Sequence, residues 1–225
     1  MIASPDLLKK SPEEWVIIAE HEMFHVFPAA TGSEQKIAAL DIASRNEAAS
    51  WQLNFPFPYG DKNVMRLIHL QGYPLWLAAT SKDNDDVKYN IGTALDAIDV
   101  YHWLLGNLNP KDYIYSEFQE WSEGVAKYTE YRFAKRAAQP DYVPVQSFRT
   151  LPGYKGYADL WKTAYRNLPF LVKHAGRAAQ DRNAFYHLGM GKALALDRVS
   201  PDWKKQYFAN GVWLDDLLRL SLTQK

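Results

Sequence analysis

Hydrophobic residues recur every three to four positions along most of the chain, which is the spacing of amphipathic helices. The stretch 83–106 shows this most clearly, because an Asp/Asn-rich start suited to cap a helix precedes its apolar residues. These apolar residues are Ile91, Leu95, Ile98, Tyr101 and Leu105. Further helices are expected at 12–27, 33–51, 61–80 with an interruption at 72–74, 112–138, 157–178, 181–197 and 201–220.

The helix expected at 12–27 has the most clearly marked start. Ser11 suits the N-cap, Pro12 suits the first helical position, and Glu14 can fold back onto the backbone of the cap. Pro28 disfavours helical backbone in the residue before it, so the helix should stop there.

The pattern as a whole predicts a mostly α protein with little or no β-sheet, folded as one domain over residues 1–225. The segment DYVPVQSF at 141–148 is the only candidate for a short strand. The hydrophobic fraction of 47% suffices for a sizeable core. The sequence leaves open whether this domain belongs to a longer protein.

Charge and cysteine content narrow the classes of function. The 26 basic residues balance the 26 acidic ones, so nothing indicates a nucleic-acid partner or a polybasic membrane surface. No apolar run approaches the length of a membrane span. The chain has no cysteine, and therefore any zinc must be held by His, Asp or Glu.

Candidate chemistry lies on the first predicted helix, where His21 and Glu22 are followed by His25. Residues four positions apart share a helical face, so the two imidazoles can bind one zinc ion. Glu22 lies beside them and could serve as a general base towards water on the metal. The neighbouring Trp-Val-Ile-Ile run indicates a buried helix, in which two histidines and a glutamate need partners.

A third ligand must come from elsewhere, and two glutamates compete for that role. Glu47 lies on the next predicted helix and is similar to the Asn-Glu of the thermolysin group, at a slightly longer spacing. Glu123 lies much further along the chain, in the segment WSEGVAKYTEY. Glu120, three residues earlier, should share the face of Glu123 and could orient a zinc-bound histidine, although a solvated helix charge is the simpler interpretation. The remaining histidines have no metal-binding spacing.

The segments WSEGVAKYTEY at 121–131 and FYHLGMGKALALD at 185–197 resemble the catalytic domain of gluzincin metallopeptidases, in the aminopeptidase N and glycyl aminopeptidase families. The resemblance implies that Glu123 is the third zinc ligand. It also implies that Tyr186 stabilises the oxyanion of the reaction. The chain departs from these families in its long interval between His25 and Glu123 and in lacking the Gly-x-Met-Glu-Asn segment that captures a substrate amino terminus.

The expected function is therefore that of a zinc-dependent metallopeptidase acting on a peptide or protein substrate, with one zinc ion per chain. One alternative is a zinc hydrolase of a non-peptide amide or ester, and another is a non-catalytic zinc-binding or scaffold module. Similar peptidases are often exported, which suggests a periplasmic or extracellular location with the signal peptide already removed. The first residues have no apolar stretch of the signal-peptide kind.

Overall fold

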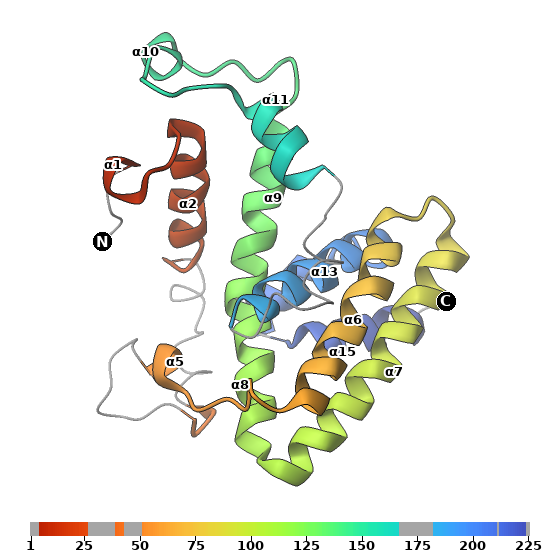
Figure 1. Cartoon of the computed structure of the whole chain (residues 1–225). Helices are drawn as coiled ribbons and strands as arrows, with labels where there is room; N and C mark the ends of the chain where they lie inside the picture. The colour runs from red at the N-terminus through yellow and green to blue at the C-terminus, as the bar shows by residue number, and fades with distance from the viewer. Residues whose placement is uncertain (1–4, 27–38, 43–50, 167–181, 211, 224–225) are drawn as a thin grey trace.

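The computed structural model describes residues 5–26, 39–42, 51–166, 182–210 and 212–223. The described residues are mostly helical and contain no strand, which confirms the predicted all-α class (Figure 1). The α-helices are α1 Pro5–Leu8, α2 Pro12–Phe24, α5 Trp51–Asn54, α6 Lys62–Thr80, α7 Asn84–Leu108, α8 Pro110–Gln119, α9 Val125–Ala137, α10 Gln146–Arg149, α11 Tyr157–Leu160, α13 Asn183–Val199, α14 Trp203–Asn210 and α15 Leu214–Thr223. Two π-helical turns are η1 Glu120–Gly124 and η2 Trp161–Tyr165.

The start of α2 agrees with the predicted capping box. The hydroxyl of Ser11 accepts a hydrogen bond from the backbone N–H of Glu14 at 3.3 Å, and the Glu14 carboxylate accepts one from the Ser11 N–H at 2.9 Å. The helix ends at Phe24, and His25 is its C-cap. The adjacent Glu13 is buried and accepts the backbone N–H groups of Lys155 and Gly156. The Glu13 carboxylate thus links the start of α2 to the loop before α11 through two hydrogen bonds.

Several predicted elements differ from the structure. The strand candidate at 141–148 is wrong: residues 142–145 are irregular and α10 begins at Gln146. Pro144 has no N–H for a sheet, and the described residues offer no partner strand. The predicted interruption at 72–74 is also wrong, because α6 continues through Pro74. Leu75 and Ala78 are fully buried next to it, so packing outweighs the lost backbone hydrogen bond.

The other differences concern helix continuity. The segment 201–220 forms two helices, α14 and α15, divided after the Asn-Gly stop signal at 210–211. A continuous helix over 33–51 is wrong at Asp41, whose φ of 51° is left-handed. Most of that range, with Glu47, lies outside the described residues, as does the end of the helix expected at 157–178.

The helices pack around α13, which contributes the largest buried share of the core. In Figure 1, α6 and α7 form an antiparallel pair on one side, and α2 lies beside α9 on the other. Helix α13 contacts both groups, through α6 and α7 on one side and through η1 and α9 on the other. Buried hydrophobic residues from α2 to α15 form one cluster.

The contact between η1 and α13 is a contact of backbones, because a glycine lies on each side. A Cβ added to Gly124 would lie 2.5 Å from the Cα of Gly189, and one added to Gly189 would lie 2.3 Å from the carbonyl oxygen of Glu120. Real Cβ atoms essentially never approach other atoms that closely. The glycines of the two motif segments therefore set the spacing between their helices.

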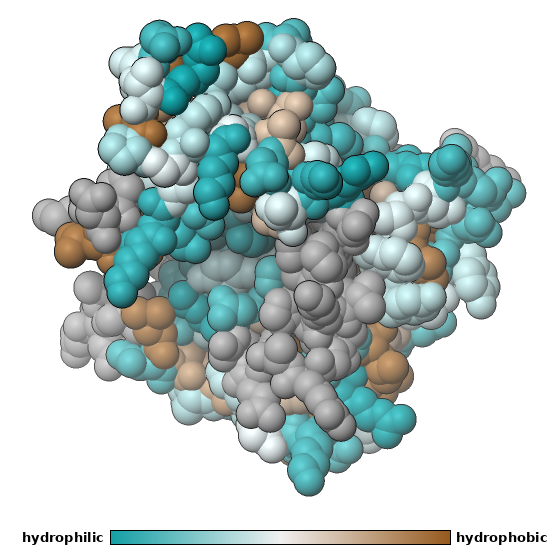
Figure 2. Space-filling model, turned by 45° about the horizontal axis from the view of Figure 1, so that its top comes forward, coloured by the Kyte–Doolittle hydropathy of each residue, from teal (hydrophilic) through white to brown (hydrophobic). Residues whose placement is uncertain are grey.

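On the face shown in Figure 2, the described residues do not form one broad apolar area. Hydrophobic residues lie there in small separate groups, and the hollow visible on this face is mainly hydrophilic. Within the described part of the chain, every helix is too short or too polar to cross a membrane.

Candidate metal centre

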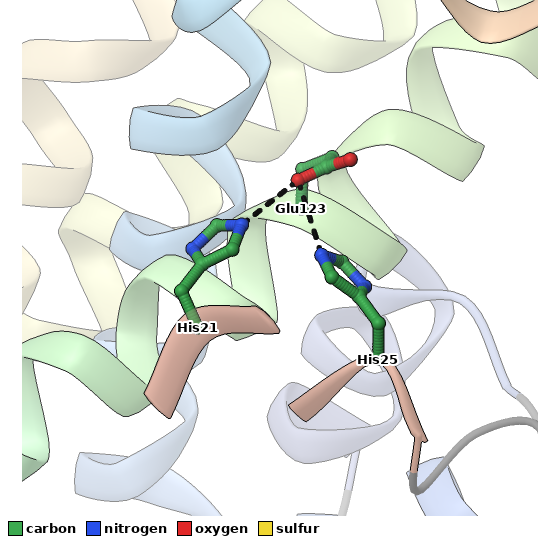
Figure 3. Close-up of side chains that lie close together, drawn as sticks. All are labelled: His21, His25 and Glu123. Carbon is green, nitrogen blue, oxygen red and sulfur yellow. Dashed lines mark hydrogen bonds and ion pairs between the residues drawn. The ribbon is translucent and has the colours of Figure 1, made fainter. Parts of the chain in front are cut away.

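His21, His25 and Glu123 converge on one point, as Figure 3 shows. The Nε2 atoms of His21 and His25 lie 3.1 and 3.4 Å from the same oxygen of Glu123. One potential ligand atom from each residue lies within 4.8 Å of the other two. The structure thus brings together the three residues that the sequence singled out as metal ligands.

The local backbone explains this convergence. His21 lies in the last turn of α2 and His25 at its C-cap, so the spacing of four residues directs both rings the same way. Glu123 lies in η1, where the wider π-helical turn interrupts the regular helix between α8 and α9. Such π-turns occur frequently at functional sites. The next residue is Gly124, so the close crossing with α13 fixes the position of Glu123.

Glu130 binds the buried His21 through Nδ1, the ring nitrogen opposite the one that contacts Glu123. Its carboxylate lies 2.7 Å from Nδ1 of His21, and its second oxygen accepts from Lys127 Nζ at 2.6 Å and from the Tyr165 hydroxyl at 3.1 Å. A carboxylate on Nδ1 directs Nε2 towards the metal position and raises its basicity. The sequence suggested Glu120 either for this role or as a solvated helix charge. Both predictions are wrong, because Glu120 is buried and binds Lys192.

The electrostatics of the centre favour a positive charge. Burial opposes the charged form of His21, but its hydrogen bonds to Glu123 and Glu130 outweigh burial and raise its pKa to about 9. Burial likewise opposes the ionised form of Glu123, yet hydrogen bonds from His21 and His25 hold its pKa well below the usual value. A proton on His21 and a metal cation would compete for the same nitrogen, Nε2.

Tyr186 lies beside His21 and Glu123. Its ring is stacked nearly parallel to the His21 ring at a centroid distance of 5.9 Å. Burial and the nearby Glu123 raise the pKa of the Tyr186 hydroxyl, so it stays protonated and can donate a hydrogen bond at neutral pH. Arg182, one turn earlier, donates from Nη2 to the Tyr186 oxygen at 2.8 Å. The sequence gave no indication of Arg182.

Glu22 follows His21 on α2 and is exposed to solvent. Within the described residues, its carboxylate accepts no hydrogen bond from another side chain or from the backbone. It lies close enough to influence the Tyr186 hydroxyl electrostatically. An exposed carboxylate at the edge of the centre remains available to water or to a substrate.

A second charged cluster adjoins the centre through η1 and was missed from the sequence. Lys192 on α13 is buried and contacts Glu120 of η1 and Asp215 of α15. His102 of α7 lies 3.3 Å from Asp215, and Glu117 is the third member of this acid–histidine group. The one available signal was a lysine among apolar residues in FYHLGMGKALALD. The cluster links α7, α8, α13 and α15 at Glu120, the first residue of η1.

The chemistry of the centre fits zinc. Two imidazole nitrogens and one carboxylate oxygen are the donors of many catalytic zinc sites, which leave a further coordination position for water or substrate. Comparison of the chain with family models, with curated proteins and with solved structures finds no match. The donor set and its surroundings therefore carry the functional argument.

Proposed function

We propose that this protein is a zinc-dependent metallopeptidase in which His21, His25 and Glu123 hold the ion. The observation that supports this most is the convergence of these three side chains from segments far apart in the sequence. Glu22 and Tyr186 beside them supply the two further groups that peptide hydrolysis requires.

Held by His21, His25 and Glu123, zinc would lower the pKa of a bound water molecule to about 7 and would polarise a peptide carbonyl. Glu22 takes the proton of the attacking water and later delivers it to the amine that leaves. Its exposure to solvent suits this exchange. The Tyr186 hydroxyl donates a hydrogen bond to the oxygen on which negative charge develops. Glu130 keeps His21 in one ring orientation throughout.

The test begins with metal content. Protein reconstituted with zinc and freed of excess should hold about one ion per chain, and less than about 0.1 ion would refute the metal site. Glu123→Ala should lose that ion. The reconstituted protein should then cleave members of a random peptide mixture followed by mass spectrometry. Glu22→Gln should abolish cleavage and keep the zinc, and cleavage that survives this change would exclude Glu22 as the general base.

A further inference from the structure

The ring of Tyr186 lies between the guanidinium of Arg182 and the imidazole of His21, one of the proposed metal ligands. Its Cζ atom is 5.5 Å from the centroid of the Tyr186 ring, and the same ring stacks on His21. Arg182 precedes α13 as its N-cap residue and is half-buried. Tyr186 thus contacts both the permanently charged Arg182 and His21 of the centre.

Arg182 differs in its partners from three of the other arginines. Arg132, Arg136 and Arg219 each pair with an aspartate. In the described part of the chain no carboxylate pairs with Arg182, whose one hydrogen bond there joins Nη2 to the Tyr186 oxygen. The carboxylate of Glu123 is already engaged by His21 and His25.

An arginine keeps its charge at any physiological pH and presents five N–H donors in a planar fork. Removing such a group from water without an anion is costly. A carboxylate supplied by a substrate would meet this need, since arginine and carboxylate form paired, charge-assisted hydrogen bonds. Apart from the bond of Nη2 to Tyr186, the guanidinium donors of Arg182 have no acceptor among the described residues.

We propose that Arg182 binds a carboxylate of the substrate next to the hydrolysed bond, and so selects acidic peptides or peptide C-termini. This inference rests on the proposed peptidase function and names its substrate class. The carboxylate has two sources, the free C-terminus and an Asp or Glu side chain. Both present the same planar anion to the guanidinium.

The test uses zinc-loaded Glu22→Gln protein, so that binding is measured without hydrolysis. The probes are N-acetyl-trialanine as free acid and as amide, and N-acetyl-Ala-Asp-Ala-amide with its Asn counterpart. In at least one pair the charged member should bind about 10- to 100-fold more tightly in calorimetry, the range of a charge-assisted hydrogen bond. The pair that discriminates identifies the source of the carboxylate.

Arg182→Gln in the same background should reduce that preference to less than about twofold, while Arg182→Lys should retain part of it. Arg149→Ala, which removes an exposed arginine of α10, is the matched charge control and should leave the preference intact. Equal binding within both pairs, no binding of any peptide, or a preference that survives Arg182→Gln overturns the inference. Absence of bound zinc would instead overturn the proposed function itself.

Discussion

The glycine contact between η1 and α13 predicts that a single methyl group will damage both stability and metal binding. In Gly189→Ala the new Cβ would lie 2.3 Å from the Glu120 carbonyl oxygen and 2.8 Å from the Cα of Gly124. Both neighbours are backbone atoms, so no side chain can rotate away. The helices must separate by about 1 Å to reach ordinary van der Waals distances.

The expected magnitude follows from two opposing terms. Replacing a helical glycine by alanine favours the helix by up to about 1 kcal/mol. Overpacking of a tight contact costs about 1–3 kcal/mol, and the rigid backbone on both sides points to the upper part of that range. Gly189→Ala should therefore lower the free energy of unfolding by about 2 kcal/mol, which corresponds to about 4–8 °C in Tm for a chain of this size. Because Glu123 adjoins Gly124, zinc should bind at least about tenfold more weakly.

Urea unfolding of the metal-free protein and competitive zinc titration measure the two effects separately. Gly92→Ala and Gly106→Ala on α7 are matched controls, since nothing lies within 4 Å of a Cβ at either position. These controls should leave zinc affinity unchanged and raise stability slightly. A Gly189→Ala protein as stable as the controls, with unaltered zinc affinity, would refute the backbone contact and the account of how Glu123 is positioned.

Three further changes have defined outcomes. Glu130→Gln should weaken zinc binding by about 10- to 100-fold in competitive titration, because it loosens the orientation of His21. Glu13→Ala should lower the unfolding free energy by about 2–3 kcal/mol in urea, because it leaves two backbone N–H groups without their acceptor. Burial and the nearby Asp215 raise the pKa of Glu117 to about 8, whereas its ordinary value is 4.5. The native protein therefore keeps this proton longer than the unfolded chain, so stability should fall as the pH rises from about 5 to about 8. Glu117→Gln should remove that part of the slope in urea unfolding at pH 5, 7 and 8.5.

Local signals explain what could be predicted from the sequence. The capping box at Ser11 and the apolar spacing of α7 depend only on neighbouring residues, and both predictions agree with the structure. The pairing of His21 with His25 follows from helix geometry. The choice of Glu123 over Glu47 rested on resemblance, and the structure brings Glu123 to the histidines.

The remaining features depend on contacts between distant segments. Nothing around Glu130 distinguishes it from a solvated helix charge until α2 packs against α9. The wider turn of η1 changes the direction of side chains three residues apart, so Glu120 faces Lys192 while Glu123 faces the histidines. Regular helical spacing predicted that both would share a face. Packing around Pro74 likewise overrode a local signal for a helix break.

The two histidines of the centre are held unequally, and this has a consequence for the kinetics of metal exchange. His21 is buried, with a side chain 10% exposed and Glu130 on its far nitrogen, whereas His25 caps the end of α2 with a side chain 29% exposed. Helix ends open more readily than helix centres. An ion bound at the proposed site should therefore enter and leave from the His25 side, so that His21 and Glu123 release it last. The rate at which a chelator removes zinc should follow the fraying of the last turn of α2, while the equilibrium affinity follows the bond between Glu130 and His21.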